Sequence, residues 1–421
     1  MELVAPAGNM EKLRTAYLYG ADAVYMGIKN FSLRRKADNF HGEEYTEIGR
    51  IKGDKKLYGA LNIYFHREDL YALEENLDYL ARFPLDGFIV SDLGIIALLQ
   101  RRFPGLALHL STQANCINRE AARVYRDLGF SRIILGRETS LDEIAAIRAG
   151  LPGLELECFI HGAMCLAYSG RCFLSRYMAD RSANQGNCAH PCRWDYRVLE
   201  EAERPGEYFP LEEGENFTSI LSSKDLCMID HLGDLKEAGV GAVKIEGRMK
   251  SAYYTAIITR AYRKHLDTLE PAPGRPIPGP EDLAFYREEL FKVSHREFST
   301  GFYFGREEMA GPTLKTYLQS HLFLGSLGER LPNRRFQLDL KNKIIAGEEL
   351  EFIGPDTALI KTRDYIIREA DTPVSEASHG RMYTLETPLP VRTGFFLRRP
   401  AHEEEQNAPP LRKRALPDPP L

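Results

Sequence analysis

Short apolar runs alternate with longer amphipathic segments from residue 2 to about residue 265. Each run is rich in β-branched and other apolar residues and has no polar face, which is typical of strands buried on both sides of a parallel sheet. These runs predict eight strands, at residues 2–5, 23–27, 57–62, 87–91, 107–111, 132–136, 154–160 and 241–246.

The segments between these strands have the spacing of amphipathic helices, most clearly at residues 9–19, 68–82, 118–127 and 141–149. Asn118 stands at an N-cap position, and Ser140 with Glu143 has the spacing of a capping box. Eight strands alternating with helices predict an α/β fold, a TIM-barrel-like domain that is complete or distorted. An open doubly wound sheet fits the same alternation and is the alternative.

A proline-rich segment separates this domain from a second pattern. Residues 268–282 hold five prolines and predict a stiff connector, with a helix after it at 283–293. Short strands with glycine or proline turns then predict a small antiparallel β-barrel; they lie at 335–340, 348–353, 358–363, 382–386 and 394–398. The expected organisation is a barrel domain over 1–267 with an insertion at 161–240, a connector and helix at 268–305, a β-barrel at 306–400, and a disordered tail at 401–421.

Composition limits the setting and the partners. The 421 residues have a formal net charge of −5, so any contact with RNA requires a local basic patch. The chain starts on an apolar run without a basic flank, and no apolar run approaches the roughly 20 residues of a membrane span. We therefore expect a cytoplasmic protein that binds neither membrane nor DNA.

Cysteines cluster in one part of the chain. Of seven cysteines, five lie between residues 165 and 227: Cys165, Cys172, Cys188, Cys192 and Cys227. In a reducing compartment this clustering favours a metal centre over disulfides. Structural zinc prefers two short knuckles, and only Cys188 with Cys192 offers one, whereas iron-sulfur clusters tolerate irregular spacing. An iron-sulfur cluster is the favoured interpretation, and zinc or uncoordinated thiols stay open.

The barrel prediction also places the chemistry. Active sites of such barrels lie at the carboxyl ends of the strands, and the cysteine segment begins where the seventh strand ends. The same rim is expected to hold Asn62, Ser111, Thr112, Gln113, Arg137, Glu138, His161, Glu246 and Arg248. The insertion would cover the barrel mouth, with the acidic residues 200–215 as a solvated loop.

Residues 157–175, from Glu157 through Cys165 and Cys172 to Ser175, resemble the signature of the collagenase-like peptidase family, family thirty-two of the unclassified peptidases. Other segments resemble blocks of the same family: 2–8, 20–25, 184–194, 223–227, 244–251 and 298–302. The resemblance spans residues 2 to about 305. The strand-rich C-terminal region is similar in kind to the small β-barrel that some members have.

The resemblance implies hydroxylation chemistry more than proteolysis. Members include prephenate-dependent or oxygen-independent hydroxylation proteins that act on tRNA wobble uridine, ribosomal RNA cytidine or ubiquinone, and several hold a 4Fe-4S cluster. The connector and small barrel resemble the tRNA branch most. The implied protein is an RNA hydroxylase with tRNA or another RNA as partner and prephenate or a similar dianion as oxygen source. A second protein of the same family is a further candidate partner. By position, the implied cluster ligands are Cys165, Cys172, Cys188 and Cys227.

Further residues receive candidate roles from this implied chemistry. Arg171, Arg193 and Arg248 are candidates for binding the dianion, since guanidinium groups bind carboxylates bidentately. Glu157, Glu246 and His161 are the catalytic candidates; each glutamate is either a general base or the ion-pair partner of an arginine, and His161 is either a thiolate partner or a packed rim residue. Tyr168 and Trp194 are placed to stack on a base or to pack near the cysteines.

Proteolysis is the alternative that the family name suggests. A serine or cysteine protease needs a nucleophile, a base and an orienting carboxylate, and a zinc protease needs a motif such as H-E-x-x-H. The sequence offers neither motif. Proteolysis therefore ranks below RNA hydroxylation.

Overall fold

The computed structural model describes residues 1–28, 31–32, 40, 43–165, 167–185, 187–193, 212–214, 217–219, 223–271, 274, 276–305 and 318–402. The chain divides into two compact units. Unit 1 comprises Met1–Leu290 and His295–Thr316, and unit 2 comprises Phe291–Ser294 and Tyr317–Leu421. In the described part of the chain, no helix is both long enough and apolar enough to span a bilayer.

Unit 1 is a closed barrel of eight parallel strands. They are β1 (Glu2–Ala7), β2 (Ala23–Gly27), β3 (Lys56–Leu61), β4 (Gly87–Val90), β5 (Ala107–Leu110), β6 (Arg132–Ile134), β7 (Glu155–Ala163) and β11 (Ala242–Ile245). The barrel closes because β11 pairs in parallel with both β1 and β7. The predicted barrel is confirmed, and this double pairing rules out an open sheet.

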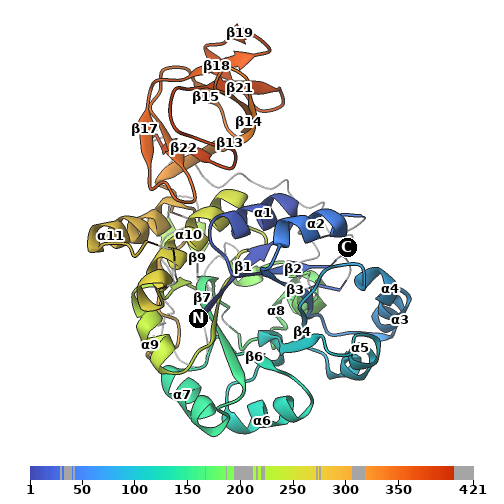
Figure 1. Ribbon diagram of the computed structural model, residues 1–421. Coiled ribbons are helices and arrows are strands. Elements are labelled where there is room, and N and C mark those ends of the chain that lie inside the picture. The colour runs from blue at the N-terminus through green and yellow to red at the C-terminus, as the bar shows by residue number, and fades with distance from the viewer. Residues whose placement is uncertain are drawn as a thin grey trace. The chain divides into compact units, whose positions relative to one another are not determined.

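Helices surround the strands on the outside (Figure 1). They are α1 (Met10–Leu18), α2 (Tyr45–Lys52), α3 (Arg67–Glu75), α4 (Leu77–Leu80), α5 (Ile96–Arg102), α6 (Arg119–Asp127), α7 (Leu141–Gly150), α9 (Leu232–Glu237) and α10 (Ala252–Leu269). The Asn118 side chain caps α6, and Ser140 with Glu143 forms the predicted capping box at α7. The single helix expected at 68–82 is two, because the chain leaves helical geometry at Asn76.

The insertion after β7 contributes short elements of its own. Helix α8 (Leu174–Ala179) follows the first cysteines, and β10 (Asp225–Cys227) pairs antiparallel with β7. Strand β12 (Phe298–Ser299) then adds to β10 in parallel. Strands β8 (Glu212–Gly214) and β9 (Phe217–Ser219) form a hairpin. Most of the predicted acidic loop at 200–215, like the predicted tail beyond residue 402, lies outside the described residues.

Helix α11 (Pro280–Glu289) begins three residues before the predicted helix at 283–293 and ends sooner, giving way to a short 3-10 turn over Leu290–Lys292. Proline fits the first position of a helix because its missing N–H has no partner there in any case. The Asp282 carboxylate also accepts a hydrogen bond from the N–H of Gly279, at 3.2 Å. Pro280 therefore starts the helix and does not belong to the stiff connector.

Unit 2 is an antiparallel sheet of eight strands that curls around its core (Figure 1), as the predicted small β domain requires. The strands are β13 (His321–Leu331), β14 (Arg335–Leu340), β16 (Leu350–Ile353), β17 (Ile360–Thr362), β18 (Ile366–Glu369), β19 (Thr372–Pro373), β21 (Tyr383–Glu386) and β22 (Phe396–Pro400), with β15 (Ile344–Ile345) and β20 (Glu376–Ala377) paired separately. Its core contains Leu324, Phe336, Phe352 and Leu397. The long strand β13 was not predicted.

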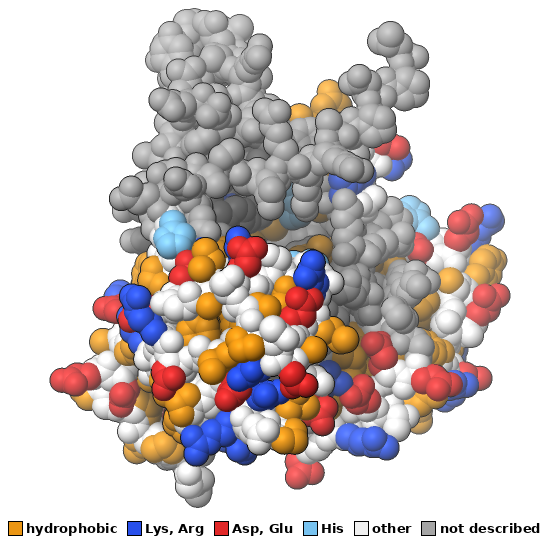
Figure 2. All heavy atoms as spheres, turned by 90° about the horizontal axis from the view of Figure 1, so that it is seen from above, with side chains coloured by type: hydrophobic (Ala, Val, Ile, Leu, Met, Phe, Trp, Pro, Cys, Tyr) orange, Lys and Arg blue, Asp and Glu red, His pale blue; other side chains and the backbone are white. Residues whose placement is uncertain are grey.

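Charged side chains are mixed on the described surface. Figure 2 shows Lys and Arg side chains interspersed with Asp and Glu, and hydrophobic side chains between them. The described chain also has exposed ion pairs, such as Arg102 with Asp78 and Arg392 with Asp356, both at N to O distances below 3 Å. Exposed pairs of this kind add little stability.

Candidate active site at the barrel mouth

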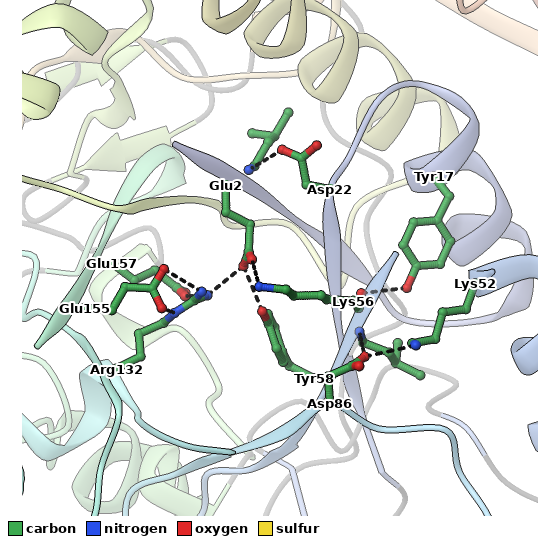
Figure 3. Close-up of polar contacts among 12 residues, drawn as sticks. Glu2, Tyr17, Asp22, Lys52, Lys56, Tyr58, Asp86, Arg132, Glu155 and Glu157 are labelled. Carbon is green, nitrogen blue, oxygen red and sulfur yellow. Dashed lines mark hydrogen bonds and ion pairs between the residues drawn. The ribbon is translucent and has the colours of Figure 1, made fainter. Parts of the chain in front are cut away.

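The barrel interior contains a buried ion network (Figure 3). The Arg132 guanidinium, from the start of β6, points toward three carboxylates, those of Glu2, Glu155 and Glu157. Its Nη1 donates to Glu2 at 2.7 Å and to Glu157 at 2.9 Å. Arg132 and Glu157 are buried, with side chains 1% and 0% exposed. The network joins strands that lie far apart in the sequence, so it forms only when the barrel is closed.

Glu157 is the candidate general base that lies deepest. Its second oxygen accepts a hydrogen bond from Lys244 Nζ at 2.7 Å. Burial alone would raise the pKa of Glu157, but the positive charges of Lys244 and Arg132 lower that pKa below its ordinary value. The carboxylate is therefore ionised and fully paired, and its geometry corresponds to the ion-pair role.

A cavity of about 50 Å³ lies above this network, at the carboxyl ends of the strands. It is lined by Tyr25, Ala60, Asn62, Ile89, Ser111, Thr112, Gln113, Ile134, Arg137, Phe159, Lys244, Glu246 and Arg248. The structure thus brings most of the predicted rim together. The lining has three cationic side chains and one carboxylate, an arrangement suited to an anionic ligand. A cavity of this size has room for a few water molecules.

Arg248 and Glu246 come from the turn after β11. The Arg248 side chain is buried, donates to Ser32 Oγ, and has its guanidinium carbon 5.8 Å from the centre of the Tyr25 ring. Its carbonyl accepts a hydrogen bond from Lys12 Nζ at 3.1 Å. Gly8 is required here, because a Cβ at this position would lie 2.4 Å from the Arg248 carbonyl oxygen. The Glu246 side chain lines the cavity and is half-buried.

His161 lies away from the cavity. The pairing of β7 with β11 shifts by one residue between Lys244 and Ile245, so that Phe159 faces Lys244 and His161 pairs with Ile245. The His161 ring packs instead against Tyr262, with Nδ1 3.3 Å from the Tyr262 hydroxyl. Burial, reinforced by His295 and Lys250, lowers the pKa of His161 to about 3. The imidazole is neutral, as in the packed interpretation of this residue.

The cysteines have different surroundings. Cys227 pairs with His161 across β10 and β7, and its Sγ lies 3.8 Å from the Tyr262 hydroxyl. Burial raises the pKa of the Cys227 thiol to about 11. Cys188 Sγ accepts a hydrogen bond from the His190 N–H at 3.3 Å, and Cys165 is exposed. All seven cysteines are free thiols.

Four of these thiols, Cys165, Cys172, Cys188 and Cys227, are the implied ligands of a 4Fe-4S cluster. Within the ranges that the structure describes, no three His, Cys, Asp or Glu side chains converge in a way that could hold a metal ion. The four implied ligands have the right chemistry, since a cubane takes four thiolates.

The remaining candidates lie on the segment after β7. Arg171 is exposed, and its N–H donates to the Tyr168 carbonyl at 3.0 Å. The side chain of Arg193 and the whole of Trp194 lie outside the described residues. Gly170 brings this segment onto the barrel rim: its φ is +73°, and a Cβ there would lie 1.9 Å from the carbonyl oxygen of Gln113.

Six lining residues were not among the predicted candidates: Tyr25, Ala60, Ile89, Ile134, Phe159 and Lys244. Each lies within a predicted strand and not after it. The signal that could have found them is the alternation of side chains, because residues two positions before a rim residue point into the same barrel interior. Lys244, two residues before Glu246, is the clearest case.

The family follows from comparison with known proteins. Residues 8–311 match Peptidase family U32, and residues 319–398 match the Peptidase family U32 C-terminal domain. The chain belongs to peptidase family U32. The first match includes β7 and the cysteine segment, and the second match corresponds to the curled sheet of unit 2.

Members of family U32 with different names resemble this chain. The tRNA hydroxylation protein P of Escherichia coli (strain K12) is 34% identical, over 92% of this chain and 94% of the relative. The 23S rRNA 5-hydroxycytidine C2501 synthase of the same organism is 37% identical over 64% of this chain, but only 40% of the relative is covered. A protein of Porphyromonas gingivalis (strain ATCC BAA-308 / W83) named Collagenase is 30% identical, over 96% of this chain and 99% of the relative.

Proposed function

We propose that this protein is an RNA hydroxylase that acts on the wobble uridine of tRNA and forms 5-hydroxyuridine. The observation that supports this most is the similarity to a tRNA hydroxylation protein along nearly the whole chain, including the C-terminal domain. The ribosomal RNA synthase among the relatives supports the broader class, hydroxylation of a pyrimidine in RNA. Ribosomal RNA cytidine is therefore the alternative substrate.

The barrel-mouth cavity is the proposed binding site for the oxygen source. We propose that Arg137, Lys244 and Arg248 bind prephenate or a similar small dianion, since two arginines and a lysine offer several charge-assisted donors to carboxylates. Glu246 is the half-buried carboxylate at the same cavity and is the better candidate for accepting a proton. A dianion such as prephenate is larger than the cavity of about 50 Å³, so the side chains at the barrel mouth must move when it binds.

A 4Fe-4S cluster on Cys165, Cys172, Cys188 and Cys227 stays a prediction, and no step of the proposed reaction is assigned to it. Its test is chemical analysis of anaerobically purified protein, with about four irons and four sulfides expected per chain. Cys227→Ser should lose the iron, and Cys192→Ser should keep it. Zinc in place of iron in the wild-type protein would contradict the prediction.

Peptidase activity is the alternative that the family name and the Collagenase relative suggest. Cys227 and His161 are a cysteine and a histidine that pair across neighbouring strands in the described part of the chain. A catalytic cysteine needs a lowered thiol pKa and a basic imidazole. Here the pKa of Cys227 is raised to about 11 and that of His161 is lowered to about 3. This pair has the wrong electrostatics for a nucleophile and its base.

Nucleoside analysis of RNA from a strain that lacks the gene tests the proposed function. The deletion should remove 5-hydroxyuridine from tRNA, and wild-type protein should restore it. The Arg137→Met variant should restore less than about a tenth of the 5-hydroxyuridine that the wild-type protein restores. The reason is that it lacks a charge-assisted contact worth about 1.5–3 kcal/mol. Arg101→Met, an exposed arginine on α5, should restore it fully. Loss of 5-hydroxycytidine from ribosomal RNA would favour the alternative substrate, and unchanged RNA with cleavage of peptides would favour the peptidase.

A further inference from the structure

An exposed aromatic surface follows the first cysteines. Phe173 is 74% exposed, Tyr177 89% and Tyr168 62%. Phe173 and Tyr177 are joined by a helical hydrogen bond of 3.0 Å, so they lie one turn apart on the same side of α8. Large rings at this exposure contribute almost nothing to the core, and clustered exposed apolar side chains mark binding surfaces.

Positive charge accompanies these rings. Residues 165–193 contain four arginines and one acidic residue, Asp180, so their net charge is +3, whereas the whole chain has a net charge of −5. Arg176 lies between the two rings in sequence and is 56% exposed; its only described carboxylate partner is Asp180, at 3.0 Å. The segment is thus the local basic patch that a protein of negative net charge needs in order to bind RNA.

A hollow of about 740 Å³ lies beside Phe173. The segment after β7 contributes Cys172, Phe173 and Arg176 to its lining, and the start of α3 contributes His66, Arg67, Glu68 and Asp69, so two arginines and two carboxylates line it. Its volume falls within the roughly 300–1,000 Å³ of sites for small ligands, which includes the size of a nucleotide. Aromatic rings, arginines and a nucleotide-sized hollow together are the features of single-stranded nucleic acid sites.

Tyr64 forms hydrogen bonds both to a residue that lines the hollow and to a residue that lines the barrel-mouth cavity. The Tyr64 N–H donates to the carbonyl of Asn184, which lines the hollow, at 3.3 Å. The Tyr64 hydroxyl donates to the carbonyl of Gln113, which lines the barrel-mouth cavity, at 2.8 Å. A strand bound at the hollow therefore has a nearby base within reach of the cavity.

We propose that Phe173, Tyr177 and Arg176 form a stacking surface for single-stranded RNA, which holds the nucleotides next to the target base. The proposal rests on the proposed RNA substrate and adds where the RNA is gripped. Unpaired bases stack on the two rings, and Arg67 and Arg176 contact phosphates. Such binding tolerates different base sequences, because every base has a π-face.

Binding of a fluorescently labelled anticodon stem-loop RNA, followed by anisotropy, tests the proposal on the full-length protein. The double change Phe173→Leu with Tyr177→Leu keeps apolar side chains and removes the ring faces, so binding should weaken at least about tenfold. Phe173→Tyr with Tyr177→Phe keeps both rings and should bind like wild type. Val124→Ala, at an exposed position on α6, is the control and should also leave binding unchanged.

Each outcome separates this surface from the proposed function. Equal binding by wild type and the double leucine variant would overturn the stacking surface and favour a protein partner there, while RNA hydroxylation would stand. No RNA binding by wild type would overturn the proposed function itself. Arg176→Gln should reduce the dependence of binding on salt, because one phosphate contact is lost. Circular dichroism should show unchanged folding, since all three side chains are exposed.

Discussion

Replacing Glu157 by glutamine tests whether this residue stabilises the barrel or catalyses the reaction. The change keeps the shape of the side chain and removes its charge. Arg132 keeps two carboxylate partners, Glu2 and Glu155. Lys244, whose side chain is 4% exposed, loses the carboxylate that lies 2.7 Å away. Removing one partner of a buried pair costs about 3–5 kcal/mol, and we expect the lower end because only one cation is left unpaired.

Denaturant unfolding followed by the helical circular dichroism signal measures this cost, because all described α-helices belong to the barrel unit. Glu155→Gln is the matched control. Glu155 pairs with the same arginine but is 42% exposed, so its replacement should lower the free energy of unfolding by less than about 1 kcal/mol. Adding Lys244→Met to Glu157→Gln should restore most of the stability, because the uncompensated ammonium is removed.

Two results would refute the reasoning. If Glu157→Gln costs no more than Glu155→Gln, then the buried network does not stabilise the barrel as described. If the Glu157→Gln variant folds with unchanged stability and loses only the hydroxylation activity, then Glu157 acts as the general base, which is one of its two predicted roles.

Three further predictions follow from local contacts. The pKa of His161 is about 3 in the folded protein against 6.5 ordinarily, so the unfolded chain takes up the proton first as pH falls. His161 should therefore lower the stability between pH 6.5 and 3, by about 2 kcal/mol at pH 5, and His161→Phe should remove this contribution in unfolding curves. Ser140→Ala removes the α7 cap and should cost about 1 kcal/mol in the same assay, and an unchanged midpoint would contradict the capping role. Gly170→Ala forces a Cβ onto the Gln113 carbonyl and should speed amide exchange around residue 170; unchanged exchange would mean that the contact is unimportant.

The sequence predicts the barrel and its rim well, because both depend on local patterns. Buried parallel strands lack polar faces, so eight apolar runs are enough to place all eight strands. Polar residues that directly follow those strands, such as Asn62 and Gln113, line the cavity as predicted. The residues at the strand ends can therefore be predicted without knowing which distant residues are in contact.

The rest depends on contacts that the sequence does not show. The pairing of Glu157 with Lys244 and Arg132 requires strands β6, β7 and β11 to meet, and the orientation of His161 depends on a one-residue register shift. Strand β13 was missed because Gly325 and Gly328 interrupt its apolar alternation. Gly325 is needed there, since a Cβ would lie 2.4 Å from the Asp339 carbonyl oxygen of the neighbouring strand.

Closure of the barrel has a consequence for how the protein is made. Glu2, Leu3 and Val4 of the first strand pair with Ala242, Val243 and Lys244 of the last. A ribosome adds roughly 5–20 residues per second, so the first strand waits on the order of 12–50 seconds for its partner. During that time one sheet edge is open, which is a risk for aggregation. All five clustered cysteines emerge before the last strand does, so any metal delivered to them during synthesis would meet an unclosed barrel.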